Sequence, residues 1–206
     1  MTTASPPRTR GGRPRDPRVD DAVGEAVLEL LGEQGWRALT VAQVAERAGV
    51  GRASIYRRWT TKEAMIAHAW RASTAEARLD AVDTGSFAAD LRALVHRATE
   101  VNERPVIRRA LPHLLAAAAD QPELTPTVVE VTIGQMLPVA EAVERAKARG
   151  EVDPAIDTAA LLDHIFAPLV IRTLVEGRPR TTEEVDRHLD LVLAAFTTTG
   201  ARRPPP

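Results

Sequence analysis

Most hydrophobic residues in this chain recur at the spacing of α-helices. The clearest example begins at Phe87, from which further apolar residues follow at i+4, i+7, i+8, i+11 and i+14. Proline is absent between Arg18 and Arg104, so helices can run freely through that part of the chain. In the first part of the chain we expect helices over residues 17–34, 40–48, 52–58 and 60–79, and a fifth helix that begins at residue 87. In the second part we expect helices over residues 105–119 and 158–176, with a helix between them that ends at residue 149. The ninth helix should begin at residue 181 or 182 and end at residue 199.

Several helix ends are predicted from capping residues and glycines. Gly35 is expected to stop the first helix. The predicted N-terminal caps are Thr40 with Gln43 and Thr60 with Glu63, both as capping boxes, and Ser86 and Asp157.

One segment argues against an entirely helical chain. Residues 128–133 form a β-branched run that would suit a strand. No other segment offers this run a partner strand, so we predict a helix there. The predicted fold class is all-α, with about nine helices.

Composition divides the chain into two domains with loose ends. Residues 1–14 and 201–206 are rich in proline and lack apolar periodicity, which predicts a disordered arm and tail. Four of the seven aromatic residues fall between Trp36 and Trp70, as expected for the core of a small domain. We predict an N-terminal domain over residues 15–79 and a C-terminal domain over residues 80–200.

Charge is distributed unevenly along a chain whose net charge is −1. Residues 1–60 contain ten arginines against seven acids, a net of +3, and the remaining residues carry −4. A basic head on an acidic body is typical of a DNA-binding module joined to a second domain.

Other residues exclude several function classes. Cysteine is absent, so disulfides, thiolate metal sites and a cysteine nucleophile are excluded. We find no phosphate-binding glycine loop, no nucleophile elbow and no ligand spacing among the five histidines, so we expect no enzyme activity, cofactor or metal. No apolar run reaches the roughly 18 residues that span a bilayer, so we expect a cytoplasmic protein without a membrane segment.

Residues 40–59 have the pattern of a helix-turn-helix motif: two short helices joined by a turn that contains glycine. The helices can touch through Val44, Ala45, Ala48, Val50 and Ile55. The second helix would then enter the major groove of DNA with its N-terminal residues facing the bases.

The polar side chains of this motif suit DNA recognition. Arg52 can donate two hydrogen bonds to guanine, Ala53 offers a methyl group to thymine, and Ser54 can bond to a base or a phosphate. The candidate phosphate contacts are Thr40, Tyr56, Arg57 and Lys62. The alternative is that these side chains are solvated charges on an ordinary helix pair.

The N-terminal arm contains the sequence Arg-Gly-Gly-Arg-Pro-Arg at residues 10–15. It resembles short arginine-rich segments that lie in the minor groove, so Arg13 and Arg15 are further candidate DNA contacts. The alternative is a tail that only improves solubility.

About 60 residues, from 17 to 77, resemble the N-terminal domain of the TetR/AcrR family of bacterial regulators. Two positions depart from the family pattern: Gly51, where serine or threonine often caps the recognition helix, and Trp59, where phenylalanine is usual. The matching segments are residues 33–36 (EQGW), 40–45 (TVAQVA), 48–51 (AGVG), 55–59 (IYRRW) and 62–65 (KEAM).

The resemblance implies that the C-terminal half binds an inducer and forms a homodimer through its last two helices. The predicted helix over 158–176 is apolar on nearly all sides and therefore needs cover on more than one face. The last helix has an apolar face formed by Val185, Leu189, Val192 and Phe196, widened by Leu191 and Ala195. The alternative is that both helices are buried within one subunit.

An inducer site is expected near three prolines, Pro112, Pro138 and Pro168, which interrupt predicted helices and favour irregular packing. The candidate ligand-binding residues are His113, Gln135, Met136, His164 and Phe166, which could line a mainly apolar cavity. Each could instead be an ordinary core or surface residue.

Together these observations predict a one-component transcriptional repressor that leaves an inverted-repeat operator when a small molecule binds. The competing hypothesis is a helical protein-interaction module whose basic head contacts a protein partner.

Overall fold

The computed structural model describes residues 16–75 and 82–197, and this part of the chain is helical without β-strands. The predicted all-α fold is confirmed, and the β-branched run lies within a helix. The elements are α1 (Pro17–Ala38), α2 (Val41–Arg47), α3 (Arg52–Tyr56), α4 (Lys62–Ala75), α5 (Phe87–Asn102), α6 (Pro105–Asp120), the 3₁₀ turn η1 (Pro122–Leu124), α7 (Thr125–Arg149), α8 (Thr158–Glu176) and α9 (Thr182–Phe196).

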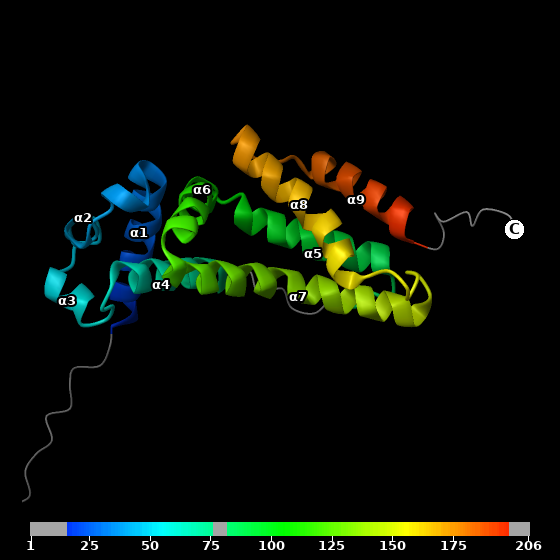
Figure 1. Cartoon of the computed structure of the whole chain (residues 1–206), viewed down its shortest axis with the longest axis horizontal. Helices are drawn as coiled ribbons and strands as arrows, with labels where there is room; N and C mark the ends of the chain where they lie inside the picture. The colour runs from blue at the N-terminus through cyan, green and yellow to red at the C-terminus, as the bar shows by residue number, and fades with distance from the viewer. Residues whose placement is uncertain (1–15, 76–81, 198–206) are drawn as a thin grey trace, which may run out of the picture.

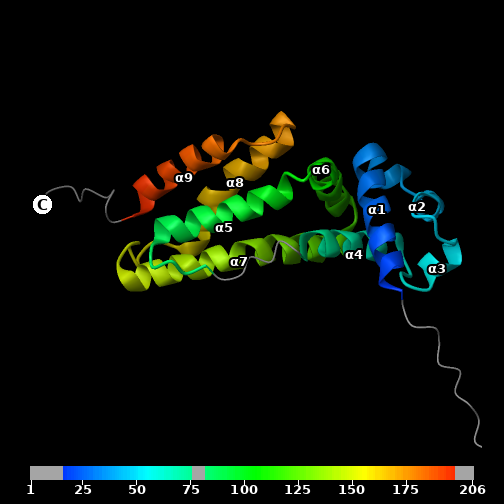
Figure 2. The same cartoon turned by 180° about the vertical axis from the view of Figure 1, so that it is seen from behind.

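The helices form two groups, with α1–α4 at one end and α5, α8 and α9 at the other (Figures 1 and 2). The long helix α7 runs beside both groups, and α6 lies next to α1. The disordered arm and tail predicted at residues 1–14 and 201–206, and the boundary predicted at residues 79 and 80, lie outside the described residues.

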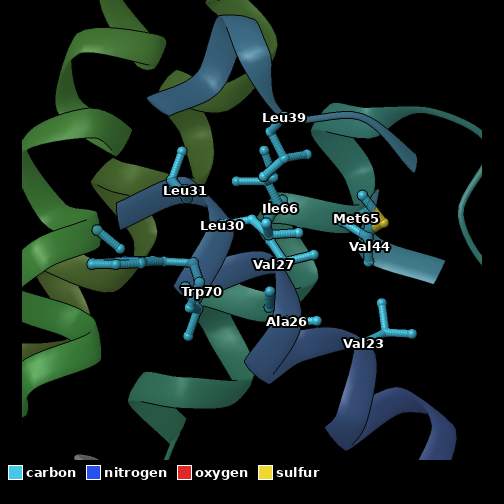
Figure 3. Packing of buried hydrophobic residues seen from close by; sticks show 14 of the residues in the cluster. Val23, Ala26, Val27, Leu30, Leu31, Leu39, Val44, Met65, Ile66 and Trp70 are labelled. Atoms are coloured by element: carbon cyan, nitrogen blue, oxygen red, sulfur yellow. The ribbon is translucent and has the colours of Figure 1, made fainter. Parts of the chain in front are cut away.

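Two separate hydrophobic cores correspond to these groups. The first core joins α1–α4, and Figure 3 shows its side chains converging from α1, α2 and α4. The second core joins α5, α8, α9 and the C-terminal half of α7. Helix α6 contributes the fully buried Ile107, Ala110 and Leu114 to the first core, although it follows α5 in sequence. The first core therefore extends well beyond residue 79.

Local hydrogen bonds explain where most helices begin. The capping boxes of Thr40 with Gln43 and of Thr181 with Glu184 are both formed. At α4 the prediction of Thr60 is wrong, because Thr61 Oγ1 accepts the hydrogen bond, from Ala64 N at 3.0 Å. Ser86 makes no side-chain cap at α5.

Helix α5 is capped instead by a distant residue. Glu151 follows α7 in the chain, and its Oε2 accepts a hydrogen bond from Phe87 N at 2.7 Å. A carboxylate at this end also interacts favourably with the helix dipole. No local sequence pattern reveals such a cap, because its two partners are 64 residues apart.

Gly35 interrupts α1 but does not end it. Its φ of 75° lies in the left-handed region that favours glycine, and the helix resumes as far as Ala38. A Cβ atom at this position would lie 3.2 Å from His113 Nδ1 on α6. Glycine at position 35 therefore allows both the backbone turn and the close approach of α6.

Helix α8 has an unusual surface. By length and composition it could cross a membrane, since an 18-residue window has a mean hydropathy of 1.5 with only 22% of that window buried. The sequence contains no uninterrupted apolar run of that length, and this window qualifies as an average that includes Asp163 and Arg172. An exposed apolar helix face equally marks a site of contact with another protein chain.

Candidate nucleic-acid interface and ligand cavity

Helices α2 and α3 form a firmly packed pair. Val44 and Ile55 are fully buried between them, with Ala45, Ala48 and Val50 in the same core, as the sequence predicted. Gly49 has a φ of 66° in the turn, a conformation that side chains other than glycine rarely adopt.

Two arginines fix this helix pair against α1 through three ion pairs. Arg47 on α2 contacts Glu29 and Glu33, each at 3.0 Å. Arg58, just after α3, contacts Asp20 at 2.5 Å with only 12% of its side chain exposed. Such well-buried charges lose little to solvent screening, so Arg58 positions α3 against α1. No local sequence pattern reveals this role of Arg58, because its partner lies 38 positions away in the chain.

The outer face of α3 carries the predicted base-reading residues. Arg52, Ala53 and Arg57 are exposed, and Tyr56 retains 58% of its accessible surface. Within the described part of the chain, Arg52 and Arg57 have no side-chain hydrogen bond or ion pair, unlike Arg47 and Arg58 beside them. The face is therefore cationic and open to a ligand.

Two predicted contacts also have structural roles. Ser54 Oγ accepts a hydrogen bond from Arg58 Nη1 at 2.8 Å. Thr40 Oγ1 accepts from Gln43 N at 3.3 Å and so caps α2. Both hydroxyls lie at or near the exposed surface, but each is partly used within the protein.

Lys62 is placed differently from the expectation. Its ammonium donates hydrogen bonds to the carbonyl oxygens of Trp36 at 2.8 Å and Leu39 at 2.9 Å, and it lies 3.9 Å from the centre of the Trp36 ring. Burial lowers the pKa of Lys62 below its usual value, because burial removes water from the charged form. This geometry ties α4 to the end of α1 and does not support the predicted role of Lys62 as a phosphate contact.

The other predicted site residues do not converge. Arg13 and Arg15, like the side chain of Gln135, lie outside what the structure describes. His113 packs against Gly35, Met136 is half-buried against the second core, and His164 is exposed with its ring 5.3 Å from that of Phe196. Helices α6, α7 and α8 continue through their internal prolines. The predicted inducer-site residues whose side chains are described therefore do not come together in one cavity.

Phe166 lines a cavity between α5, α6 and α8 that is about 40 Å³ in volume. Its walls are mainly apolar, and Leu111 of α6 is part of them. Leu111 also packs against the first core. One side chain thus contacts both the cavity and the core that carries α3.

This combination defines a helix-turn-helix DNA-binding protein with a second helical domain that encloses a small cavity. The family profile described as "Bacterial regulatory proteins, tetR family" matches residues 25–69, and the profile "Tetracyclin repressor-like, C-terminal domain" matches residues 81–192. The chain belongs to the TetR family.

Individual relatives agree with this assignment. The chain is 32% identical to the HTH-type transcriptional regulator YdeS of Bacillus subtilis, over 92% of this chain and 93% of YdeS. It is 33% identical to the HTH-type transcriptional regulator AqdR of Rhodococcus erythropolis, over 70% and 69% of the two chains. A crystal structure of a TetR-family regulator from Rhodococcus sp. superposes with a TM-score of 0.71 at 23% identity, covering 86% of this chain and 97% of that one.

The protein is therefore a DNA-binding transcriptional regulator, and its family and relatives are regulators rather than enzymes. Regulators of this family bind DNA operators and act as dimers with small-molecule ligands. They are soluble and generally cytoplasmic proteins.

Proposed function

We propose that this protein is a homodimeric repressor that binds an inverted-repeat operator through α3 and leaves it when a small molecule enters the C-terminal domain. The observation that carries this proposal is the outer face of α3, whose cations are free of intramolecular partners within the described residues while the adjacent arginines are paired. Unpaired guanidinium groups on an exposed helix are available for phosphates and guanine edges.

The proposed DNA contacts follow from exposure. Arg52 and Ala53, in the first turn of α3, reach base edges, while Tyr56 and Arg57 contact phosphates. The N-terminus of α2 at Thr40 adds backbone donors for a phosphate, and Ser54 contributes the hydrogen of its hydroxyl group. Arg13 and Arg15 extend the contact into the adjacent minor groove.

The proposed dimer uses the exposed sides of α8 and α9. Val170, Ile171 and Val175 on α8 are 38%, 57% and 79% exposed, and Leu191 on α9 is 69% exposed. The stripe first predicted for this interface is largely internal, since Val185, Leu189 and Val192 are buried within the second core. Two copies that cover the remaining apolar face would form a symmetric four-helix contact.

Release by a ligand would run through α6. Because Leu111 contacts both the cavity and the first core, a ligand that enlarges the cavity displaces α6 against α1 and α4. The two recognition helices then no longer match successive major grooves, which lie about 34–36 Å apart. The ligand must bind the released conformation more tightly than the DNA-bound one.

Selection of bound fragments from random duplexes tests the DNA-binding part of this proposal. We expect a symmetric site whose half-sites lie about one helical turn apart, with affinity that falls steeply as salt rises. A reporter gene placed behind the selected site should be repressed. Recovery of unrelated sequences with no common motif would favour the protein-interaction module instead.

A further inference from the structure

A second, larger hollow between α8 and α9 adjoins the small cavity beside α6. The inner cavity has apolar walls that include Ala98, Phe166 and Val170. The outer hollow has a volume of about 150 Å³, and Leu191 of the proposed dimer interface is part of its lining, as Val170 is of the inner cavity, so the site borders that interface. Leu169 and Arg180 line both spaces, so the two adjoin at these side chains.

The outer hollow is strongly cationic. Three guanidinium groups line it, those of Arg172, Arg180 and Arg187. The one carboxylate in the lining, Glu184, already accepts hydrogen bonds from Arg178, with the longer one at 2.9 Å. Arg178 is not itself part of the lining. The hollow therefore has an excess of positive charge that its own carboxylate does not balance.

Arg180 has an unfulfilled bonding requirement at the junction. Its Nε atom is buried and has no hydrogen-bond partner in the described part of the chain. Arg172 and Arg187 likewise form no ion pair with any described residue. A buried donor left without an acceptor is costly, so an acceptor supplied by a ligand would be bound favourably.

The inner cavity also contains an acid, Glu103, whose contacts are long. Glu103 Oε2 lies 3.9 Å from Arg108 Nε and accepts no hydrogen bond from a described residue, and Thr173 Oγ1, which lies 3.5 Å from Glu103 Oε1, also donates to Leu169 O at 3.0 Å. Arg108 additionally donates to the carbonyl oxygen of Gly177. Because Glu103 is itself a carboxylate, it would repel the carboxylate of a ligand, which would therefore bind at the arginines of the outer hollow.

We propose that the two spaces form one site for a small amphipathic carboxylate, whose apolar part enters the inner cavity and whose carboxylate binds Arg180 with Arg172 and Arg187. Guanidinium groups pair with carboxylates through charge-assisted hydrogen bonds, and apolar walls select the hydrocarbon part. The inference deepens the proposed function and rests on it, since the same site would hold the ligand that displaces Leu111.

Binding of hexanoate to the full-length protein, compared with 1-hexanol and hexylamine, tests the charge requirement. Calorimetry and ligand-observed NMR without DNA should show hexanoate bound at least about tenfold more tightly than either analogue. Along a series from butanoate to octanoate, each methylene that enters the cavity should raise affinity about three- to fourfold, until the inner cavity is full. Equal affinity for hexanoate and 1-hexanol would overturn the proposal.

Substitutions at Arg180 test where the carboxylate binds. Arg180→Gln should weaken hexanoate binding at least about tenfold, and Arg180→Lys, which keeps the charge, should restore part of it. Arg97→Gln is the matched control, because Arg97 is exposed on α5 outside both spaces. Thermal unfolding of each variant checks that the fold is retained. Unchanged hexanoate affinity in a folded Arg180→Gln protein would contradict the assignment.

Arg172 and Arg187 distinguish a ligand site from an interface. If both glutamine variants loosen the dimer without changing hexanoate affinity, these guanidinium groups pair with a second copy and the proposal is wrong. Mobility-shift assays with the selected operator, carried out on the same protein preparations, separate a failure of the proposed ligand class from a failure of the proposed function. Operator binding without hexanoate binding contradicts only the ligand class, and hexanoate binding without operator binding contradicts only the proposed function.

Discussion

The core around α1 and the core around α5 differ in how completely a single chain covers them. Among the large hydrophobic residues that remain exposed in the described structure, only Tyr56 belongs to α1–α4, and the others lie on α7, α8 and α9. Helices α1–α4 therefore cover their own apolar side chains almost completely, whereas α7, α8 and α9 leave apolar side chains exposed. The comparison teaches that the DNA-binding helices can fold around a core within one subunit, while the apolar surface of the C-terminal helices is available to the partner that we propose.

The two regions also differ in whether their arginine side chains have acidic partners. In the C-terminal region Arg92 on α5 contacts Asp186 at 3.3 Å and Asp190 at 2.5 Å, and Arg149 at the end of α7 pairs with Asp83 and Glu151. On the outer face of α3 the cations have no such partners in the described structure. The pairs of Arg92 fix α5 against α9, whereas the absence of such pairs on the outer face of α3 leaves its charge available for DNA.

Cavity-forming substitutions should have the largest effect and should separate the two cores. Leu31→Ala and Leu161→Ala each remove a fully buried side chain, one from each core, and should each cost about 2–5 kcal/mol of unfolding free energy. Amide hydrogen exchange should rise in α1, α4 and α6 for Leu31→Ala, and in α5, α8 and α9 for Leu161→Ala. Continued protection of α6 in a folded Leu31→Ala protein would show that α6 does not belong to the first core.

A charge on the exposed face of α8 should break the dimer without unfolding the subunit. Ile171→Asp would place an unpaired carboxylate in the proposed interface and weaken dimerisation about a hundredfold or more in sedimentation experiments. Leu137→Asp on α7 is the control, because Leu137 is 54% exposed and Ile171 is 57% exposed. Similar dissociation constants for the two variants would place the interface elsewhere.

Arg52 and Lys62 should respond differently to alanine substitution. Arg52→Ala should cost about 1–3 kcal/mol at one base position and relax specificity there. Lys62→Ala should lower the unfolding free energy by about 1–3 kcal/mol, because the two carbonyl oxygens it binds lose their donor. The dependence of DNA affinity on salt should be unchanged in Lys62→Ala, and a reduced slope would restore its role as a phosphate contact.

The smallest expected effect is on the stability of the C-terminal helices at acidic pH. Hydrogen bonds, first from Arg178 and then from the Thr181 backbone, lower the pKa of Glu184 from 4.5 to about 2. A lowered pKa in the folded state contributes stability that is complete above about pH 4.5 and is lost as the pH falls towards about 2. Glu184→Gln should flatten this part of the stability profile in denaturant titrations, whereas Glu141→Gln, exposed on α7, should not.

Local patterns predicted the helices and the recognition face well. Periodicity and caps located α8 to the residue, and the amphipathic pattern of residues 40–59 separated the buried Val44 and Ile55 from the exposed Arg52 and Tyr56. These features depend on neighbours in sequence, so a single chain reveals them.

Features that depend on distant contacts were not predictable. A lysine at the start of α4 has the same local pattern whether it faces DNA or two carbonyl oxygens of α1. The stripe of Val185 and Leu189 on α9 could equally have faced a partner or its own core. The cavity residues were missed because the prolines, which were expected to create irregular packing, lie within continuous helices.

The burial of α6 in the first core limits how this regulator can be re-engineered. A chimera that grafts residues 1–79 onto the sensor of another regulator would leave the faces of α1 and α4 against a foreign α6. Ile107, Ala110 and Leu114 of this protein's own α6 would have to be transferred together with residues 1–79, and the side chain at position 113 would have to fit against Gly35. The exchangeable unit is therefore discontinuous in sequence.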